Sequence, residues 1–83
     1  MTRLRLLTTK HCHLCASARE VLARVAAASG TDWDEVDVAG DDELAREYGD
    51  RLPVVLLDGR EHGYWTVDED RLLRDLGAVA PEP

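Results

Sequence analysis

The sequence predicts an α/β fold in which three helices flank a four-stranded mixed sheet, in the order β-α-β-α-β-β-α. Short apolar or alternating segments, typical of strands, are separated by segments whose apolar residues recur at helical spacing. An Asp-Gly pair between the last two strand-like segments favours a two-residue hairpin turn. The 83 residues suffice for one compact domain. We expect that domain over residues 1–77, with a frayed tail over residues 78–83.

The first half of the chain is expected to form strand, helix and strand. Residues 3–8 alternate and then become apolar, as strands do. Residues 14–25 carry apolar side chains at helical spacing, and Gly30 supplies a C-terminal stop. Residues 33–38 alternate again. Because a helix joins these two strands, we expect them to be parallel, with a right-handed crossover.

The second half is expected to add a short helix, a hairpin and a last helix. Asp41 can cap the short helix. Residues 54–57 are consecutively apolar, which indicates a central strand buried on both faces, and residues 60–64 return antiparallel to it. Thr66 and Glu69 match a capping box with Thr66 as the N-cap of the last helix. This order of elements is the thioredoxin-fold arrangement.

The charge balance excludes several classes of partner. The chain carries 17 acidic and 10 basic residues, a formal net charge of −7. Such a field repels nucleic-acid phosphates and anionic lipid, so we expect neither nucleic acid nor membrane as a partner. No apolar run is long enough for a membrane span or a secretory signal. We therefore expect a cytoplasmic monomer.

Two cysteines at the start of the first predicted helix are the candidate catalytic residues. Cys12 and Cys15 form a Cys-X-X-Cys motif directly after a strand, the usual setting of a redox pair. A free cysteine has a pKa of roughly 8.5, and a helix N-terminus favours its anion. Lys10, His11 and His13 can add positive charge that tunes this pKa. We expect Cys12 to attack, and Cys15, which lies deeper along the helix, to resolve the mixed disulfide.

Two other interpretations of these residues stay open. The cysteines could bind zinc or an iron–sulfur cluster with a neighbouring histidine, but the crowding is poor geometry for one tetrahedral ion and no second Cys-X-X-Cys exists. We therefore assign no metal ligands. Alternatively, the thiols could be inactive in an adaptor that docks proteins through Tyr64 and Trp65. Trp65 could also simply pack against the last helix, and His62 is interpreted as a surface residue of the hairpin.

Several segments together carry a resemblance to a known family. They are Lys10-His11-Cys12-His13-Leu14-Cys15, Val36-Asp37-Val38, Glu43-Leu44-Ala45-Arg46-Glu47-Tyr48-Gly49, Leu52-Pro53-Val54-Val55 and Asp58-Gly59. The chain resembles glutaredoxin-like proteins of the thioredoxin superfamily, and within them a short bacterial group with a Cys-His-Leu-Cys motif. The resemblance implies a thiol–disulfide oxidoreductase, active in cell redox homeostasis, that reduces protein disulfides or mixed disulfides with a low-molecular-weight thiol.

The resemblance also implies substrate-binding residues and partners. Pro53 matches the cis-proline that faces the cysteine pair, where the backbone of Leu52 would pair with an extended substrate. No bound cofactor is implied. The expected partners are disulfide-containing proteins or small thiols, with glutathione or another thiol as co-substrate and a reductase or thiol for recycling. Glutaredoxins bind glutathione at a turn that has a Gly-Gly pair followed by an acidic residue. Residues 62–66 of this chain carry one glycine and two aromatic residues at the corresponding place, so we expect this turn to have a different shape.

Overall fold

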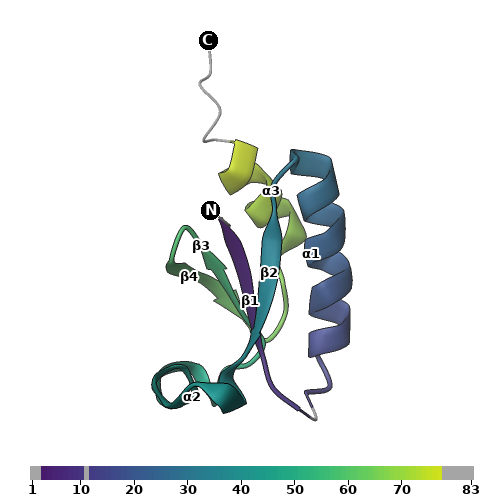
Figure 1. The fold of residues 1–83 in the computed structure, drawn as a ribbon. Coiled ribbons are helices and arrows are strands. Elements are labelled where there is room, and N and C mark those ends of the chain that lie inside the picture. Colours follow the sequence, from purple (N-terminus) through teal and green to yellow (C-terminus); the bar gives the residue numbers. More distant parts are fainter. Residues whose placement is uncertain (1–2, 11, 78–83) are drawn as a thin grey trace.

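A computed structural model describes residues 3–10 and 12–77 of the chain. Its elements are β1 (Leu4–Thr8), α1 (Cys15–Ser29), β2 (Trp33–Asp37), the 3-10 helix η1 (Val38–Gly40), α2 (Asp42–Tyr48), β3 (Val54–Leu57), β4 (Arg60–Tyr64) and α3 (Glu69–Gly77) (Figure 1). The expected tail over residues 78–83 lies outside the described residues. None of the described helices is long and apolar enough to cross a bilayer.

The strands form one sheet in the order β2-β1-β3-β4. β1 runs parallel to β2 and antiparallel to β3, and β3 pairs antiparallel with β4. The two central strands are the most apolar and the most buried, whereas β2 and β4 at the edges carry charged side chains. This distribution is expected because central strands are covered on both faces and edge strands are not. The predicted thioredoxin-like α/β arrangement is confirmed.

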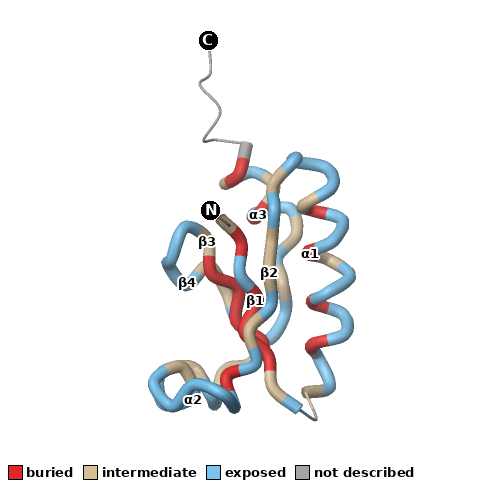
Figure 2. Tube along the Cα trace, viewed as in Figure 1, coloured by how far each residue is buried: buried red, intermediate tan, exposed pale blue. Residues whose placement is uncertain are grey.

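The larger part of the core lies between the sheet and the helices α1 and α3. Figure 2 shows buried positions along β1, β3 and the side of α1 that faces the sheet. Apolar residues of α1 recur every three or four positions, so they form one stripe that packs on the strands. The buried members of this cluster are Leu4, Leu6, Ala18, Leu22, Val25, Val55, Leu72 and Leu76.

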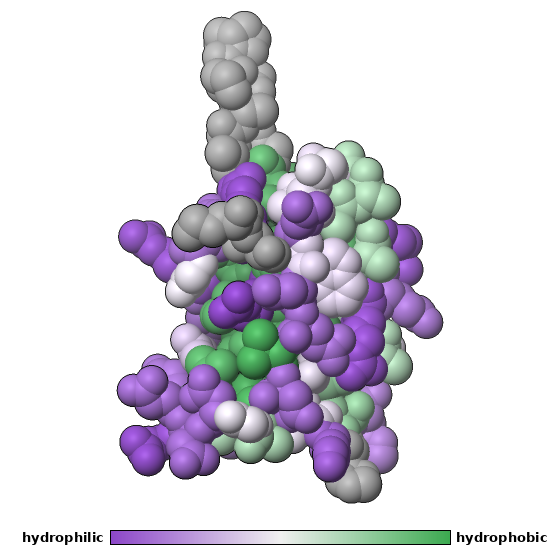
Figure 3. Space-filling model, viewed as in Figure 1, coloured by the Kyte–Doolittle hydropathy of each residue, from purple (hydrophilic) through white to green (hydrophobic). Residues whose placement is uncertain are grey.

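A smaller core lies on the opposite face of the sheet, beneath α2. Its buried members are Leu7, Val38, Val54 and Leu56. Val38 was expected in the second strand, but it begins η1 because Asp37 turns the chain there by accepting the Ala39 N–H at 2.9 Å. α2 has only seven residues, so ion pairs such as Arg5–Asp34 cover part of this face instead. Figure 3 shows the resulting surface, with hydrophilic side chains around a small apolar area.

The last helix begins later than the sequence predicts. Asp68, not Thr66, caps it: the Asp68 carboxylate accepts the Arg71 N–H at 3.0 Å. Glu69 does not close a capping box, because its carboxylate accepts two hydrogen bonds from Arg24 on α1, at 3.1 and 3.3 Å. The capping-box prediction was therefore wrong. Glu69 instead forms an ion pair with Arg24, which is distant in the sequence, and the adjacent Asp68 supplies the cap.

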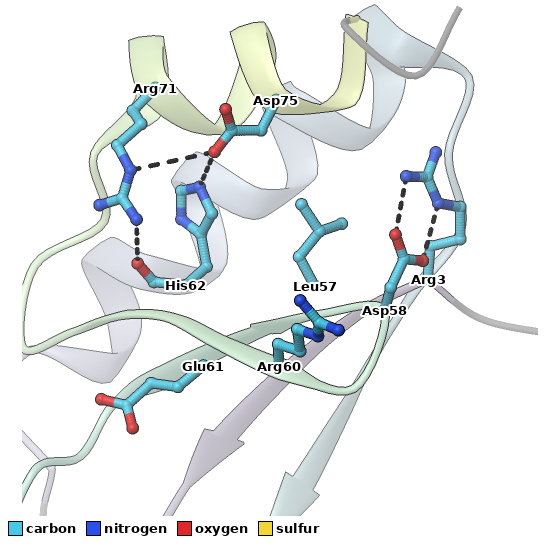
Figure 4. Close-up of a pocket in the computed structure, with 8 residues that line it drawn as sticks. All are labelled: Arg3, Leu57, Asp58, Arg60, Glu61, His62, Arg71 and Asp75. Atoms are coloured by element: carbon cyan, nitrogen blue, oxygen red, sulfur yellow. Dashed lines mark hydrogen bonds and ion pairs between the residues drawn. The ribbon is translucent and has the colours of Figure 1, made fainter.

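The hairpin and α3 are joined by a polar network around His62 (Figure 4). The His62 side chain is only 7% exposed, and its Nε2 lies 2.6 Å from the Asp75 carboxylate. Arg71 donates to the His62 carbonyl at 2.8 Å. A β-bulge in this hairpin accompanies the arrangement. The largely buried His62 therefore holds α3 against the hairpin and is not the surface residue that was expected. It borders an open hollow of about 500 Å³ at the Asp58-Gly59 end of the hairpin.

The position of the α3 cap can be tested by paired substitutions. We expect Asp68→Ala to lower the free energy of unfolding by about 1 kcal/mol, because one N–H of the first turn loses its acceptor. Thr66→Ala should change it by less than about 0.5 kcal/mol, because Thr66 makes no side-chain cap. Urea unfolding followed by circular dichroism measures both. A larger loss for Thr66→Ala than for Asp68→Ala would contradict this cap.

Candidate active site

The two cysteines lie between β1 and α1 and differ in burial. Cys12 lies in the turn before the helix and is partly exposed, while Cys15 is the first residue of α1 and only 1% exposed. Their sulfurs form a disulfide with an S–S distance of 2.11 Å and a Cα–Cα distance of 5.4 Å. The expectation that Cys15 is the more deeply placed thiol is confirmed.

The helix begins at Cys15 and not at Cys12, so Cys12 precedes the first turn. Leu14 is the N-cap and provides no side-chain cap. The Cys15 N–H donates to the Cys12 carbonyl at 3.4 Å, and the Ala18 N–H donates to Leu14 at 3.1 Å. The first-turn amides between them have no hydrogen-bond partner among the described residues. The positive end of the helix dipole therefore faces the turn that carries Cys12.

Pro53 lies at the same end of the sheet. The Leu52–Pro53 peptide bond is cis, and Pro53 is fully buried. β1 and β3 pair with Leu7 opposite Val54, so Pro53 lies alongside the end of β1 from which the cysteine turn departs. Leu52 precedes the strand, and neither its N–H nor its carbonyl has a hydrogen-bond partner among the described residues.

The segment after β4 forms a tight turn at this same end. Trp65 has a φ of +67°, and the Thr66 N–H donates to the Tyr64 carbonyl at 2.8 Å, which defines a γ-turn centred on Trp65. The Trp65 N–H donates to the Pro53 carbonyl at 2.8 Å. Trp65 is 52% exposed and its ring meets the Tyr64 ring edge-on at 5.0 Å, so the residue is not buried against the last helix.

Comparisons with known proteins agree with this geometry. Residues 3–77 match the family model of the Glutaredoxin-like domain (DUF836). The chain belongs to this glutaredoxin-like family. Uncharacterized proteins of Mycobacterium tuberculosis and Mycobacterium bovis are 49% identical to it over 76 residues, covering 86% of this chain and 78% of theirs.

Solved structures place this glutaredoxin-like chain in the thioredoxin fold. Protein XcR50 from Xanthomonas campestris is 38% identical, with a TM-score of 0.72, over 94% of this chain and 99% of that one. Glutaredoxin C1 from poplar is 18% identical, with a TM-score of 0.59, over 90% of this chain and 86% of its own, which shows the fold alone. Together with the Cys12–Cys15 disulfide, the family indicates a redox-type function.

The basic residues expected near Cys12 are only partly described. Lys10 and His13 are exposed and form no ion pair with the described residues. His11 lies outside the described residues. Within the described ranges, no group of three or more histidine, cysteine or carboxylate side chains is arranged to hold a metal ion.

A polar cluster beside α1 is a feature of this glutaredoxin-like site that the sequence did not reveal. Arg19, one turn after Cys15, donates two hydrogen bonds of 2.8 Å to Glu35 on β2, and the buried Thr8 hydroxyl donates to the same carboxylate at 2.9 Å. The Arg19 hydrogen bonds hold the pKa of Glu35 below its ordinary value of 4.5, and partial burial opposes this. The cluster fastens the start of α1 to two strands. No local pattern predicts it, because its members are brought together by strand register.

The Glu35 cluster should make stability depend on pH in the acid range. Because the folded-state pKa of Glu35 is lowered, its contribution is present above pH 4.5 and is lost as pH falls through the folded-state value. We expect Glu35→Gln to lower the free energy of unfolding at pH 7 by about 0.5 to 1 kcal/mol. The variant should then lose less stability than the parent between pH 5 and pH 3, measured by thermal unfolding.

The matched control is Glu47→Gln on α2. Glu47 is exposed and forms no hydrogen bond or ion pair with the described residues. Parallel pH profiles for the parent and Glu35→Gln would refute the role given to the cluster, and a changed profile for Glu47→Gln would assign the effect to overall charge.

Proposed function

We propose that this protein is a dithiol thiol–disulfide oxidoreductase that reduces protein disulfides or mixed disulfides between proteins and a low-molecular-weight thiol. The observation that carries the proposal is the asymmetry of the pair. Cys12 is partly exposed in a turn, whereas Cys15 is 1% exposed and within bonding reach of it. An accessible thiol can attack a large substrate, and a buried neighbour can then resolve the product without competing for the substrate.

The proposed reaction balances without a bound cofactor. In the reduced protein, the Cys12 thiolate attacks one substrate sulfur, the substrate S–S bond breaks, and the departing thiolate takes up a proton. The Cys15 thiolate then attacks Sγ of Cys12, forms the intramolecular disulfide and releases the second substrate thiol. The protein loses two electrons and two protons, and the substrate disulfide gains them as two thiols.

The start of α1 favours the thiolate that this reaction needs. The first-turn amides, which have no partner within the described part of the chain, lie next to the Cys12 turn, and the exposed Lys10 and His13 lie close to Cys12 in the sequence. We assign these two residues, with His11, to tuning the pKa of Cys12.

Leu52 is the proposed backbone contact for an extended substrate. Its N–H and carbonyl have no partner among the described residues, and it lies at the sheet end that carries the cysteine turn. A substrate strand that pairs with these two groups would hold its disulfide over Cys12. The neighbouring Pro53 is buried, which keeps this backbone in place.

The oxidised pair requires a reductant to complete the cycle. Two molecules of a low-molecular-weight thiol, glutathione or an alternative, or a dithiol reductase can supply the two electrons. We propose that the protein acts in this way as a cytoplasmic monomer in redox homeostasis.

Single cysteine variants test the mechanism. We expect Cys12→Ser to abolish reduction of a peptide disulfide, because the attacking sulfur is lost. Cys15→Ser should still attack but should accumulate a mixed disulfide between Cys12 and the peptide, visible as a mass increase under non-reducing conditions. Full turnover by both variants would end the proposal, as would a failure of the reduced parent protein to reduce any protein or small-thiol disulfide.

The electrostatic role of Lys10 predicts a smaller effect. We expect Lys10→Gln to slow alkylation of Cys12 in the reduced protein at pH 7 by about two- to fivefold at low ionic strength, because a cation near the thiolate is removed. Iodoacetamide labelling followed by mass spectrometry measures the rate. The control is Arg46→Gln on the exposed side of α2, which should leave the rate unchanged; equal rates for all three proteins would exclude the role of Lys10.

A further inference from the structure

A small notch lies at the start of α1, where Leu14 of the cysteine motif forms part of its lining. It has a volume of about 140 Å³ and opens between the first turns of α1 and the segment that joins β4 to α3. Its lining residues are Leu14, Ser17, Ala18, Val21, Trp65, Thr66 and Val67. None of them is charged, in a chain of which one third is charged. A charged group would therefore find no oppositely charged side chain among them.

The large apolar side chains that the described part of the chain leaves exposed gather here. They are Leu14, Tyr64 and Trp65, which are 42%, 45% and 52% exposed. Leu14 and Trp65 form walls of the notch, and Tyr64 supports the Trp65 ring edge-on. Exposed apolar groups that cluster around a hollow are typical of an interaction site.

The backbone at Trp65 indicates that its side chain serves a purpose other than folding. A φ of +67° is unfavourable for every residue with a Cβ and costs glycine nothing. The conformation is held by the hydrogen bonds from Trp65 to Pro53 and from Thr66 to Tyr64. A large side chain that is half exposed contributes little to the stability of the fold, although its backbone is strained. Such strain is concentrated at functional sites.

We propose that this notch is a specificity pocket for one apolar side chain of a polypeptide substrate, next in sequence to the substrate cysteine that bonds to Cys12. The proposal rests on the proposed thiol–disulfide function. Leu14 lies between the two cysteines in the sequence and lines the notch, which places the notch within reach of a segment bonded to Cys12. A space of 140 Å³, about the volume of five water molecules, is large enough for one aliphatic side chain and too small for a larger group.

The same features disfavour glutathione as the preferred substrate. A pocket that holds a whole small ligand has a volume of about 300 Å³ or more, well above that of the notch. The charged termini of glutathione would find no oppositely charged side chain in this lining, whereas an apolar side chain of a protein leaves water on entering it. The notch therefore selects protein disulfides with an apolar neighbour.

Matched peptide substrates test the pocket. Two peptides differ only in Leu or Ser beside a cysteine that carries a chromogenic thiol as a mixed disulfide. We expect the parent protein to reduce the Leu peptide with a kcat/KM about tenfold or more above that for the Ser peptide. Trp65→Gly should reduce this ratio to about two or less while leaving Tm equal or higher, because the backbone strain is relieved.

Other variants distinguish an effect on the notch from a general loss of structure. Val21→Thr replaces a wall methyl by a hydroxyl at nearly constant volume and should also lower the ratio. Trp65→Phe should retain most of it, since an apolar wall remains. Trp33→Phe on β2 is the control for loss of a tryptophan and should keep the full ratio. Equal kcat/KM for the two peptides, or an unchanged ratio in both Trp65→Gly and Val21→Thr, overturns the proposal.

A binding measurement keeps this proposal distinct from the proposed function. In a protein with Cys12→Ser, Cys15→Ser and Trp33→Phe, Trp65 is the remaining tryptophan and its emission reports on the notch. Peptides with Ser in place of Cys should shift this emission when they carry Leu and not when they carry Ser. A Leu-specific shift without any reduction by the parent would refute the proposed function and retain the pocket. Reduction without peptide preference or shift would refute the pocket and retain the function.

Discussion

The antiparallel pairing of β1 with β3 is the constraint on which the site depends. It sets Leu7 opposite Val54, so the end of β1 that leads into the cysteine turn lies beside Pro53. β3 then pairs with β4, and Val54 opposite Tyr64 brings Trp65 to the same end of the sheet. The two central strands are covered on both faces, and a shift of one residue would exchange the side chains that fill the two cores. Core packing therefore fixes the strand register, and the register in turn fixes where the cysteine turn, Pro53 and Trp65 lie.

The difference between the two thiols follows from where α1 begins. Cys15 is the first helical residue and continues the apolar stripe that packs on the sheet, so its sulfur is buried with the core. Cys12 lies one turn earlier, outside the stripe, and stays accessible. The Arg19–Glu35 pair holds the start of the helix against β2, and the Thr8 hydroxyl ties the same carboxylate to the end of β1. A charge cluster at the helix start thus supports the difference in burial between the two cysteines.

The order of elements was predictable because each signal for it is local. Alternating apolar residues, helical spacing and the Asp58-Gly59 turn are each visible within a few consecutive residues. Together they predict the strands and helices that the structure has. The Cys-X-X-Cys motif is a local signal too, because its two cysteines are three residues apart. What the sequence did not reveal depends on partners far along the chain: Glu35 pairs with Arg19 through strand register, and Glu69 pairs with Arg24 across two helices and so leaves the cap to Asp68. Competition between a local and a long-range partner cannot be decided from spacing.

Trp65 is the residue at which local preference and observed structure disagree most. Propensity alone would place a glycine at a φ of +67°, yet the chain has a tryptophan there, half exposed and at the sheet end that carries the cysteine turn. The surrounding hydrogen bonds enforce this conformation, since the Pro53 carbonyl and the Tyr64 carbonyl each accept an amide of the turn. Sequences agree with their folds at most positions, and departures concentrate where function is selected. The same end of the sheet that positions the cysteines therefore also positions Trp65, the side chain that we propose selects their substrate.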